Sequence, residues 1–401
     1  MNISEFLNSA KRLEKEITEN RRWLHSNAEV GFELEKTAPF VKEKLCDMGY
    51  DVTPCGKNGL TATIGEGDKV FLLRADMDAL PVKEESGLDF ASGNGNAHLC
   101  GHDMHTAMLL GAAHLLKQYK SELKGIVKLM FQPAEEILSG ADNMIKNGVL
   151  DNPSVNAAMM IHVMAGLPLK SGAVVVSSGG VSAPAADYFT INVQGKGCHG
   201  STPQDGVDAL SVAAYIVMAL QELSARELGV NETAVITVGR LNAGTAGNVI
   251  ADTAFMEGTM RCYDSTVREK IKKRLCEITE SVALTFRAKA TVAFGNGCPV
   301  LENNNELSVS VEKHIKELLG EDNVSTSEKL GGKTNKGGGS EDFSYISQKV
   351  PSVMLALAAG EPGEGYEYPQ HHPKVMFDES VLTVGSAVYA YSALRWLEDN
   401  A

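Results

Sequence analysis

Apolar and polar positions in the first half of the chain follow two alternating patterns. Three segments have the apolar spacing of amphipathic helices and are predicted as helices near residues 4–22, 36–48 and 105–119. Three short continuous apolar runs are predicted as buried strands at 69–76, 125–133 and 156–163. Helices that alternate with strands covered on both faces predict an α/β sheet.

The order of elements changes after a glycine- and serine-rich segment at 177–186. The next elements are predicted as a strand at 188–194, a helix at 208–227, strands at 233–241 and 252–262, a helix at 264–286 and a strand at 289–294. This β-α-β-β-α-β order is the ferredoxin-like pattern. We therefore predict an α+β domain at 185–295, inserted into an α/β domain formed by 1–184 and 296–401. The α/β domain resumes with a helix near 296, a strand at 351–357 and a final helix at about 378–397.

Composition narrows the class of protein and its surroundings. A chain of 401 residues is longer than one core usually organises, which supports two domains. The net charge of −14 argues against nucleic acid or an anionic membrane as a partner, because both bind basic surfaces. The N-terminus has no apolar signal core, and no run of about 18 apolar residues occurs. The seven cysteines are odd in number and scattered, so we expect free thiols and a cytoplasmic protein.

Polar side chains follow each of the three predicted strands. Asp76 and Asp78 follow the first, Glu135 and Glu136 follow the second, and His162 lies at the end of the third. In open α/β sheets, ligands bind beyond the carboxyl ends of the strands. We therefore expect these side chains to converge on one crevice.

The segment "NAHLCGHDMH" (96–105) places several possible metal ligands just ahead of a predicted helix. Metal ions bind deprotonated cysteine, neutral histidine and carboxylate, usually gathered from several strand ends. The candidates are Cys100, His102, Glu136, His162 and one of His371 or His372. Five ligands exceed a closed tetrahedral site and suit two ions that share bridging ligands and a water. Each cysteine or histidine taken alone is more often a hydrogen-bonded core residue.

The two acidic pairs have alternative interpretations. Adjacent side chains at a strand end diverge, so Glu136 could bind a metal while Glu135 faces the water as general base. Two surface glutamates at a helix start are the alternative. Asp76 and Asp78 share one side of a strand, and either could bind metal. Asp78 could instead orient a metal-bound histidine with its carboxylate or cap the following turn.

Three further residues lie in the predicted inserted domain. The segment "GKGCHG" (195–200) satisfies a dinucleotide-binding pattern, but no helix follows it directly, so we reject that site. It places His199 in a turn. Asn248 and Arg261 carry an amide and a guanidinium that would suit a substrate carboxylate, whereas a surface ion pair is the alternative for Arg261.

Together these motifs resemble one enzyme family along nearly the whole chain. They are "LRADMDALPV", "CGHDMH", "FQPAEE", "HV", "GCHGSTP", "NVIADTA", "GTMR", "GSEDFS" and "HHPKVMFDE". The chain resembles the metal-dependent aminoacylase and carboxypeptidase amidohydrolases. Within them it is similar to the branch of hippurate hydrolases, auxin-conjugate (IAA-amino acid) hydrolases and N-acetyl-diaminopimelate deacetylases. The resemblance implies a di-metal exopeptidase-like catalytic domain and a ferredoxin-like lid that forms a homodimer.

The resemblance also implies residue roles. The ligands it implies are Cys100, His102, Glu136, His162 and His371, because the family pattern His-x-Pro selects His371 over His372. It implies Glu135 as general base and His199 as a group that binds substrate or polarises its carbonyl, often across the dimer interface. It implies that Asn248 and Arg261 contact the substrate carboxylate. We further expect Asp78, Asp103 and His105 to support the ligands from behind.

The activity implied is hydrolysis of the linear amide of an N-acyl amino acid to a carboxylic acid and a free amino acid. Two divalent ions (Zn, Mn, Co or Ni) would activate a shared water, whose proton Glu135 takes. A metallo-dipeptidase or carboxypeptidase is the alternative enzyme, although its first motif would be His-x-Asp rather than Asp76-Met77-Asp78. A catalytically silent metal- or ligand-binding protein would not need Glu135. The chain departs from the family pattern at "NAHLCGHD", at Cys198 and in the glycine-rich stretch 331–339.

Overall fold

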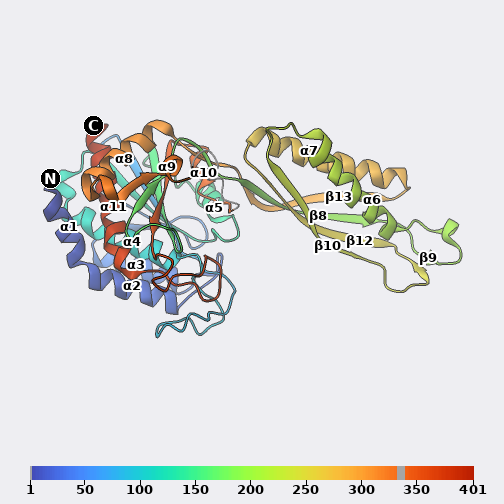
Figure 1. Cartoon of the computed structure of the whole chain (residues 1–401), viewed down its shortest axis with the longest axis horizontal. Helices are drawn as coiled ribbons and strands as arrows, with labels where there is room; N and C mark the ends of the chain where they lie inside the picture. Colours follow the sequence, from blue (N-terminus) through green and yellow to red (C-terminus); the bar gives the residue numbers. More distant parts are fainter. Residues whose placement is uncertain (1, 332–338) are drawn as a thin grey trace. The chain divides into compact units, whose positions relative to one another are not determined.

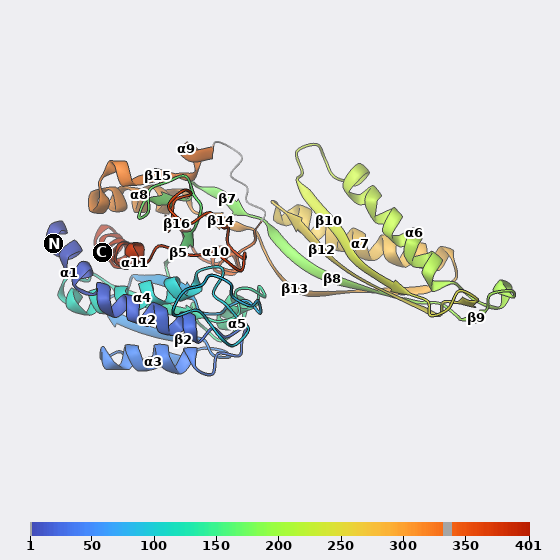
Figure 2. The same cartoon turned by 60° about the horizontal axis from the view of Figure 1, so that its bottom comes forward.

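The structure is a computed structural model that describes residues 2–331 and 339–401. The chain forms two compact units (Figures 1 and 2). The first contains the described residues up to Ser182, those from Glu302 to Gly331, and those from Asp342 onward. The second contains Ala183–Leu301 and residues 339–341. Most of the glycine-rich stretch noted above, 332–338, lies outside the described residues.

The first unit is built on an eight-stranded sheet in the order β1-β2-β4-β3-β5-β16-β6-β15. Its strands are β1 (Val52–Pro54), β2 (Leu60–Gly65), β3 (Val70–Asp76), β4 (Ile126–Gln132), β5 (Ala157–Met164), β6 (Val174–Val176), β15 (Val324–Thr326) and β16 (Ser352–Ala358). The central strands β4, β3, β5 and β16 are parallel. Every residue of β3 is buried, which explains its apolar run from Val70 to Leu73. The predicted α/β class is confirmed.

Helices cover this sheet. They are α1 (Ile3–Arg12), α2 (Glu14–Ser26), α3 (Thr37–Asp47), α4 (His102–Gln118), α5 (Gly140–Lys146), α8 (Asn305–Leu319), α9 (Ser327–Gly331), α10 (Ser344–Ser347) and α11 (Leu382–Asp399). The apolar helices α4 and α11 pack against each other and against β3, and α2 packs on α4. The core of the unit therefore lies between α4, α11 and the centre of the sheet.

Several predicted boundaries differ from the structure. The helix predicted at 4–22 is two helices, because the chain turns tightly at Leu13, whose amide bonds to Ala10 O. The buried apolar positions keep one helical period across this turn, so the pattern does not reveal it. Helix α4 begins at His102, three residues earlier than predicted. The helix predicted near 296 begins at Asn305, because the preceding strand continues to Cys298.

The second unit has the predicted ferredoxin-like order. Its main sheet, β10-β12-β8-β13, is antiparallel. The elements are β8 (Ala185–Gln194), α6 (Ala209–Glu222), β10 (Ala234–Ala243), β12 (Thr253–Cys262), α7 (Ser265–Thr285) and β13 (Lys289–Cys298). Burial alternates along β12 because α6 and α7 pack on one face of the sheet. A short pair, β9 (Cys198–His199) and β11 (Val249–Ile250), lies apart from this sheet, and β7 (Gly180–Ala183) pairs with β14 (Leu301–Asn303) where the chain passes between units.

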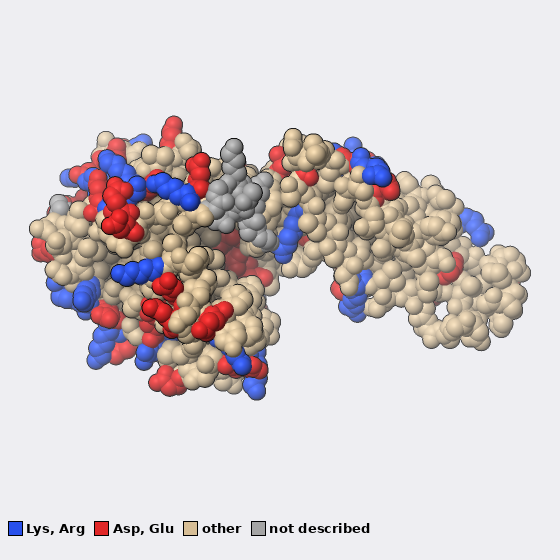
Figure 3. Space-filling view, in the orientation of Figure 1, with Lys and Arg blue, Asp and Glu red and all other residues tan. Residues whose placement is uncertain are grey.

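The surface differs between the units. No helix among the described residues is both long and apolar enough to cross a membrane. Figure 3 shows many Lys, Arg, Asp and Glu side chains on the first unit and few on the visible face of the second. Exposed large apolar side chains of the second unit include Leu210, Tyr215 and Met218 on α6 and Val235 on β10. The second unit thus exposes several large apolar side chains on one helix and on one edge strand.

Candidate metal centre

The carboxyl ends of the parallel strands bring the candidate ligands together as predicted from the strand order. Asp76 is the last residue of β3, Glu135 and Glu136 lie in the turn that follows β4, and His162 lies near the end of β5. His102 begins helix α4, which packs on β3 and β5. Neighbouring parallel strands place their ends at one edge of the sheet, so these five side chains surround one site.

His102 is held in the tautomer that a metal ligand needs. Its Nδ1 donates to the carbonyl oxygen of Asp78 at 2.9 Å, so in the neutral ring the lone pair lies on Nε2. Nε2 is buried and has no hydrogen-bond partner among the described residues. A buried ring nitrogen without a hydrogen-bond partner is costly, and this atom therefore fits a metal ion that would take the place of its proton.

The ring of His162 is also oriented by a hydrogen bond from its Nδ1 to a backbone carbonyl oxygen. Its Nδ1 donates to Val163 O at 2.7 Å, and its Nε2 lies 3.5 Å from the sulfur of Cys100. Burial lowers the pKa of His162 to about 3, which keeps the ring neutral and its lone pair available.

Cys100 needs a cation to become a ligand. Burial raises the pKa of its thiol to about 12 in the metal-free protein. Burial alone would lower the pKa of His102, but the charges of Asp76 and Cys100 outweigh it and raise that pKa well above its ordinary value. A metal ion would therefore displace a proton from each of these two groups.

The candidate ligands form two groups that share the Cys100 sulfur. One group is Cys100, His102 and His162, and the other is Cys100, Glu136 and His371. Within each group the ligand atoms lie within 4.8 Å of one another. Two three-ligand groups with one common thiolate fit a pair of ions better than a single closed site. The donor set therefore fits a dinuclear centre.

His371 rather than His372 faces this centre. Its Nε2 lies 3.7 Å from Glu136 Oε2, and its backbone has a left-handed φ of 67°. Its amide donates to Leu99 O at 2.9 Å, which ties the segment to the Cys100 loop. The ring of His372 instead stacks on Tyr368, with 4.4 Å between ring centroids.

The two glutamates are fixed by one carboxylate. Asp78 Oδ1 accepts from the amide of Glu135 at 3.0 Å, and Oδ2 accepts from the amide of Glu136 at 3.2 Å. Glu135 is only 6% exposed, and its Oε2 lies 3.9 Å from His102 Nε2. The Asp78 side chain therefore caps the turn after β4, whereas its backbone carbonyl orients His102. The alternative prediction, that the Asp78 carboxylate orients the histidine, fits less well because His102 Nδ1 lies 3.6 Å from Asp78 Oδ1, beyond hydrogen-bond distance.

Asp103 and His105 lie behind the ligands in two separate networks. His105 contacts Asp76 and the backbone of β5, as described below. Asp103 Oδ2 accepts from His25 Nδ1 at 2.8 Å and contacts Arg21 Nε at 2.7 Å. His25 Nε2 contacts Glu84 at 2.9 Å.

Sequence reasoning missed the part of this network that comes from α2. The sequence does show two basic residues, Arg21 and His25, on the buried side of an amphipathic helix. Their role could not be inferred from the sequence, because their partner Asp103 lies about 80 residues further along the chain.

The substrate-binding candidates all lie in the second unit, but not together. Val249 pairs with His199, and Gly200 N donates to Asn248 O at 2.8 Å, so His199 and Asn248 are neighbours. Arg261 lies near the opposite end of β12, where its Nη1 donates to Ser340 Oγ at 2.9 Å. Thr253 and Arg261 are eight residues apart on that strand, or about 26 Å.

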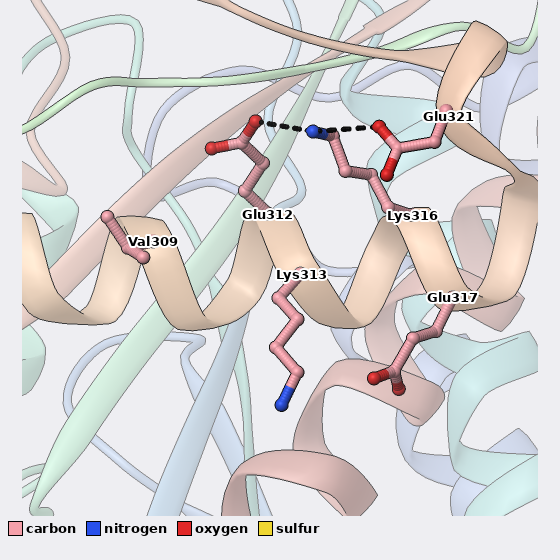
Figure 4. A pocket seen from close by; sticks show the side chains of 6 residues that line it. All are labelled: Val309, Glu312, Lys313, Lys316, Glu317 and Glu321. Carbon is pink, nitrogen blue, oxygen red and sulfur yellow. Dashed lines mark ion pairs between the residues drawn. The ribbon is translucent and has the colours of Figure 1, made fainter.

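A surface hollow of about 420 Å³ lies elsewhere, on the outer side of α8. Figure 4 shows Lys316 paired with Glu312 and Glu321 there, at 3.1 and 3.0 Å. Its lining is Val309, Glu312, Lys313, Lys316, Glu317 and Glu321. None of the candidate ligands lines it, so it is a solvated, ion-paired helix face outside the metal centre.

Comparison with known proteins decides the family. The model of the family described as Peptidase family M20/M25/M40 matches residues 72–395. The chain belongs to this family. The matched region contains all the candidate ligands.

Relatives place the chain among the family's amidohydrolases. It is 36% identical over 394 residues to N-acetyl-L-cysteine deacetylase of Bacillus subtilis, covering 97% of this chain and 90% of the relative. It is 35% identical over 403 residues to thermostable carboxypeptidase 2 of Saccharolobus solfataricus, covering 98% of each. It is 35% identical over 390 residues to IAA-amino acid hydrolase ILR1-like 2 of Arabidopsis thaliana, covering 95% and 85%.

A solved structure gives the same assignment. The Bacillus subtilis YXEP protein, described as a dinuclear metal binding peptidase of the M20 family, has a TM-score of 0.77 and 30% identity. The match covers 97% of this chain and 99% of that one. The predicted resemblance and fold are confirmed, and the protein is a metal-dependent amidohydrolase of the peptidase family M20/M25/M40.

Proposed function

We propose that this protein hydrolyses the amide of N-acyl amino acids with two divalent ions held by Cys100, His102, Glu136, His162 and His371. The observation that carries the proposal is the buried Glu135 carboxylate, 3.9 Å from the Nε2 of His102. A protein that only stores or binds metal has no need of an additional carboxylate at that place. Divalent ions bound by these residues would supply Lewis-acid chemistry, which would lower the pKa of a bound water and polarise the amide carbonyl.

Glu135 moves the proton. Its backbone is fixed by Asp78, so its carboxylate is held at one place beside the ligands. It takes a proton from the attacking water and delivers it to the nitrogen of the leaving amino acid, which departs as a neutral amine.

His199 is suited to bind the carbonyl oxygen of the substrate. Its Nδ1 accepts the backbone N–H of Ser201 at 3.1 Å, so the neutral ring carries its proton on Nε2. That Nε2–H is a donor for an oxygen that gains negative charge during the reaction. Asn248 lies beside it, and Arg261 offers a guanidinium to the substrate carboxylate.

We propose that the protein acts as a homodimer through the second unit. Asn248 and His199 lie beyond the Thr253 end of β12, and Arg261 lies eight residues, or about 26 Å, further along that strand, so His199 and Arg261 of one chain cannot both contact one N-acyl amino acid. Two copies remove this conflict if the partner supplies His199 and Asn248. The exposed apolar side chains on α6 and β10 support such an interface.

The types of the candidate ligands and the free cysteines support a choice of metal and of cellular compartment. A thiolate with imidazole ligands favours zinc, whereas the carboxylate also suits manganese, cobalt or nickel. All seven cysteines are free in the structure. Free thiols and a thiol ligand support action in the reducing cytoplasm.

The test is release of free amine from a panel of N-acyl amino acids that differ in the acyl group. The protein is first chelated and then loaded separately with zinc, manganese and cobalt. We expect metal-restored turnover on one acyl class. Glu135→Gln should bind the same amount of metal and lose about 10³-fold or more in kcat, as for loss of a general base.

Dipeptides and C-terminally blocked peptides form the second arm of the panel. Turnover on peptides without turnover on N-acyl amino acids would assign the carboxypeptidase activity instead. Metal uptake without turnover on either arm would contradict the proposed function.

A further inference from the structure

We propose that Asp342, from the "GSEDFS" motif, positions the metal centre through a buried chain of hydrogen bonds that ends at the backbone of β5. The proposal rests on the function proposed above, which gives this motif no role. Asp342 is fully buried and belongs to neither of the two ligand groups that share Cys100; one of its carboxylate oxygens instead lies within 4.8 Å of a carboxylate oxygen of Glu135 and of Glu341.

Asp342 joins three elements at one carboxylate. Its Oδ1 accepts from Arg74 Nη2 at 2.9 Å and from Gln132 Nε2 at 2.7 Å. Its Oδ2 accepts from the amide of Ala141 at 2.9 Å. Arg74 is on β3, Gln132 ends β4 and Ala141 is in the first turn of α5. These contacts require an acceptor at both oxygens, which only the ionised carboxylate supplies.

Arg74 carries the contact toward the metal centre. Its Nη1 donates to Asp76 Oδ2 at 2.7 Å and its Nε donates to Gln132 Oε1 at 2.9 Å. Arg74 and Asp76 are two residues apart on β3 and therefore share one side of the strand. Because the guanidinium is planar, its contacts to Asp342 and Gln132 fix the direction of the bond to Asp76.

Asp76 sets the tautomer of His105. Its Oδ1 lies 2.6 Å from His105 Nδ1, and an ionised carboxylate only accepts, so Nδ1 carries the proton. His105 Nε2 accepts from the amide of Val163 at 2.8 Å. A ring with its proton on Nε2, or with two protons, would turn a donor toward that amide.

The last bond of this chain reaches a metal ligand. Val163 follows His162, and its carbonyl accepts from His162 Nδ1. The amide of Val163 is thus held by His105 while its carbonyl orients His162. Loss of the Asp342 charge should weaken the ion bound by Cys100, His102 and His162 more than the ion bound by Cys100, Glu136 and His371.

The variant is Asp342→Asn, which keeps the shape of the side chain but places an NH₂ group against a donor. We would titrate chelated protein with zinc and with cobalt against a competing chelator. We expect affinity for one of the two ions to fall by about 10- to 100-fold, as for other groups that hold metal ligands from behind. The cobalt spectrum of that ion should change as well. If Asp342→Asn bound both ions with the wild-type affinities and gave the wild-type cobalt spectrum, the proposal would be overturned.

Asp187→Asn is the matched control. Asp187 is a buried carboxylate in the second unit that accepts from Arg268 Nε and Nη2, both at 2.7 Å. The Asp187→Asn substitution also removes one carboxylate charge from a buried ion pair. The control should lower thermal stability without changing the affinity for either ion. Weakened metal binding in the control would show that any loss of a buried charge has this effect, which would overturn the positioning role.

A second measurement reports the tautomer directly and also serves if Asp342→Asn folds poorly. Protein with ¹⁵N-labelled histidine and zinc should show one Nδ1–H histidine with a strongly deshielded proton, absent in His105→Gln. His105→Gln should weaken the same ion as Asp342→Asn. A wild-type His105 with its proton on Nε2 would overturn the proposal. Neither measurement uses a substrate, so absence of amide hydrolysis would contradict the proposed function alone.

Discussion

His25 is a charged residue inside the protein. Each of its ring nitrogens faces a carboxylate, Asp103 at 2.8 Å and Glu84 at 2.9 Å, so both nitrogens must be donors. Burial alone would lower the pKa of His25, but the bonds to Asp103 and Glu84 outweigh it and raise the pKa above 6.5. Arg21 adds a second cation to Asp103.

This charge gives a pH-dependent contribution to stability. A raised pKa stabilises the folded state fully below pH 6.5, and the contribution is lost as pH rises through the folded value. His25→Gln should lower the free energy of unfolding of metal-free protein by about 3 kcal/mol at pH 6. The difference from wild type should shrink toward alkaline pH, as measured by urea unfolding at several pH values. A difference that stays constant or grows with pH would show that His25 is neutral in the folded protein.

Metal uptake should release protons. The Cys100 thiol, with its pKa raised to about 12 by burial, and the His102 ring, with its raised pKa, must both deprotonate to bind an ion. Calorimetric titration at pH 7 in buffers of different ionisation enthalpy should show about two protons released, with affinity rising with pH. Cys100→Ser should release about one proton fewer. Equal release by both proteins would contradict the assignment of Cys100 as a ligand.

At the scale of elements, the turn into α4 places two ligands next to each other. Gly101 has a φ of 90°, and a Cβ there would lie 2.4 Å from Val163 Cγ2. This glycine separates Cys100 from His102. The left-handed turn and the close contact with β5 therefore both depend on the absence of a side chain.

Gly101→Ala should weaken metal binding as well as stability. We expect a loss of about 1–3 kcal/mol in the free energy of unfolding, together with reduced metal content by elemental analysis. Gly95→Ala is the control, because Gly95 has a φ of 91° but open space around it. It should cost about 1 kcal/mol of backbone strain and leave metal content at the wild-type level. Full metal content in Gly101→Ala would mean that the turn does not position the ligands.

The sequence predicted the elements that carry the candidate centre, and the family resemblance supplied the choice of candidate ligands. Apolar runs that end in Asp76, Glu135 and His162 are local signals, and parallel strands bring such ends together. The left-handed backbone at His371 was not predictable, because few residues other than glycine adopt this conformation. The amide of His371 bonds to Leu99 O, a contact with a distant part of the chain that no local pattern reveals. The role of Asp342 depends on contacts with Arg74 and Gln132, which are more than 200 residues away and leave no periodic pattern.

At the scale of the whole molecule, the proposed dimer has a complementation test. Glu135→Gln and His199→Gln should each be inactive alone. If His199 serves the partner's centre, a hybrid dimer contains one site with both Glu135 and His199 intact. An equimolar mixture that exchanges subunits should recover about a quarter of wild-type activity, since about half of the dimers are hybrids with one working site. No recovery, with hybrid dimers verified by mass spectrometry, would place His199 in its own chain's site.

The network around Asp103 limits where the chain can be truncated. The family match begins at residue 72, whereas Arg21 and His25, which neutralise Asp103, lie on α2. A chain cut at residue 72 would keep every candidate ligand but leave the fully buried Asp103 carboxylate without its two cations. Breaking a buried ion pair from one side typically costs about 3–5 kcal/mol, a large part of the stability of a domain. The recognisable part of the enzyme is therefore smaller than the part that can fold, and any truncation or fusion has to keep the first two helices.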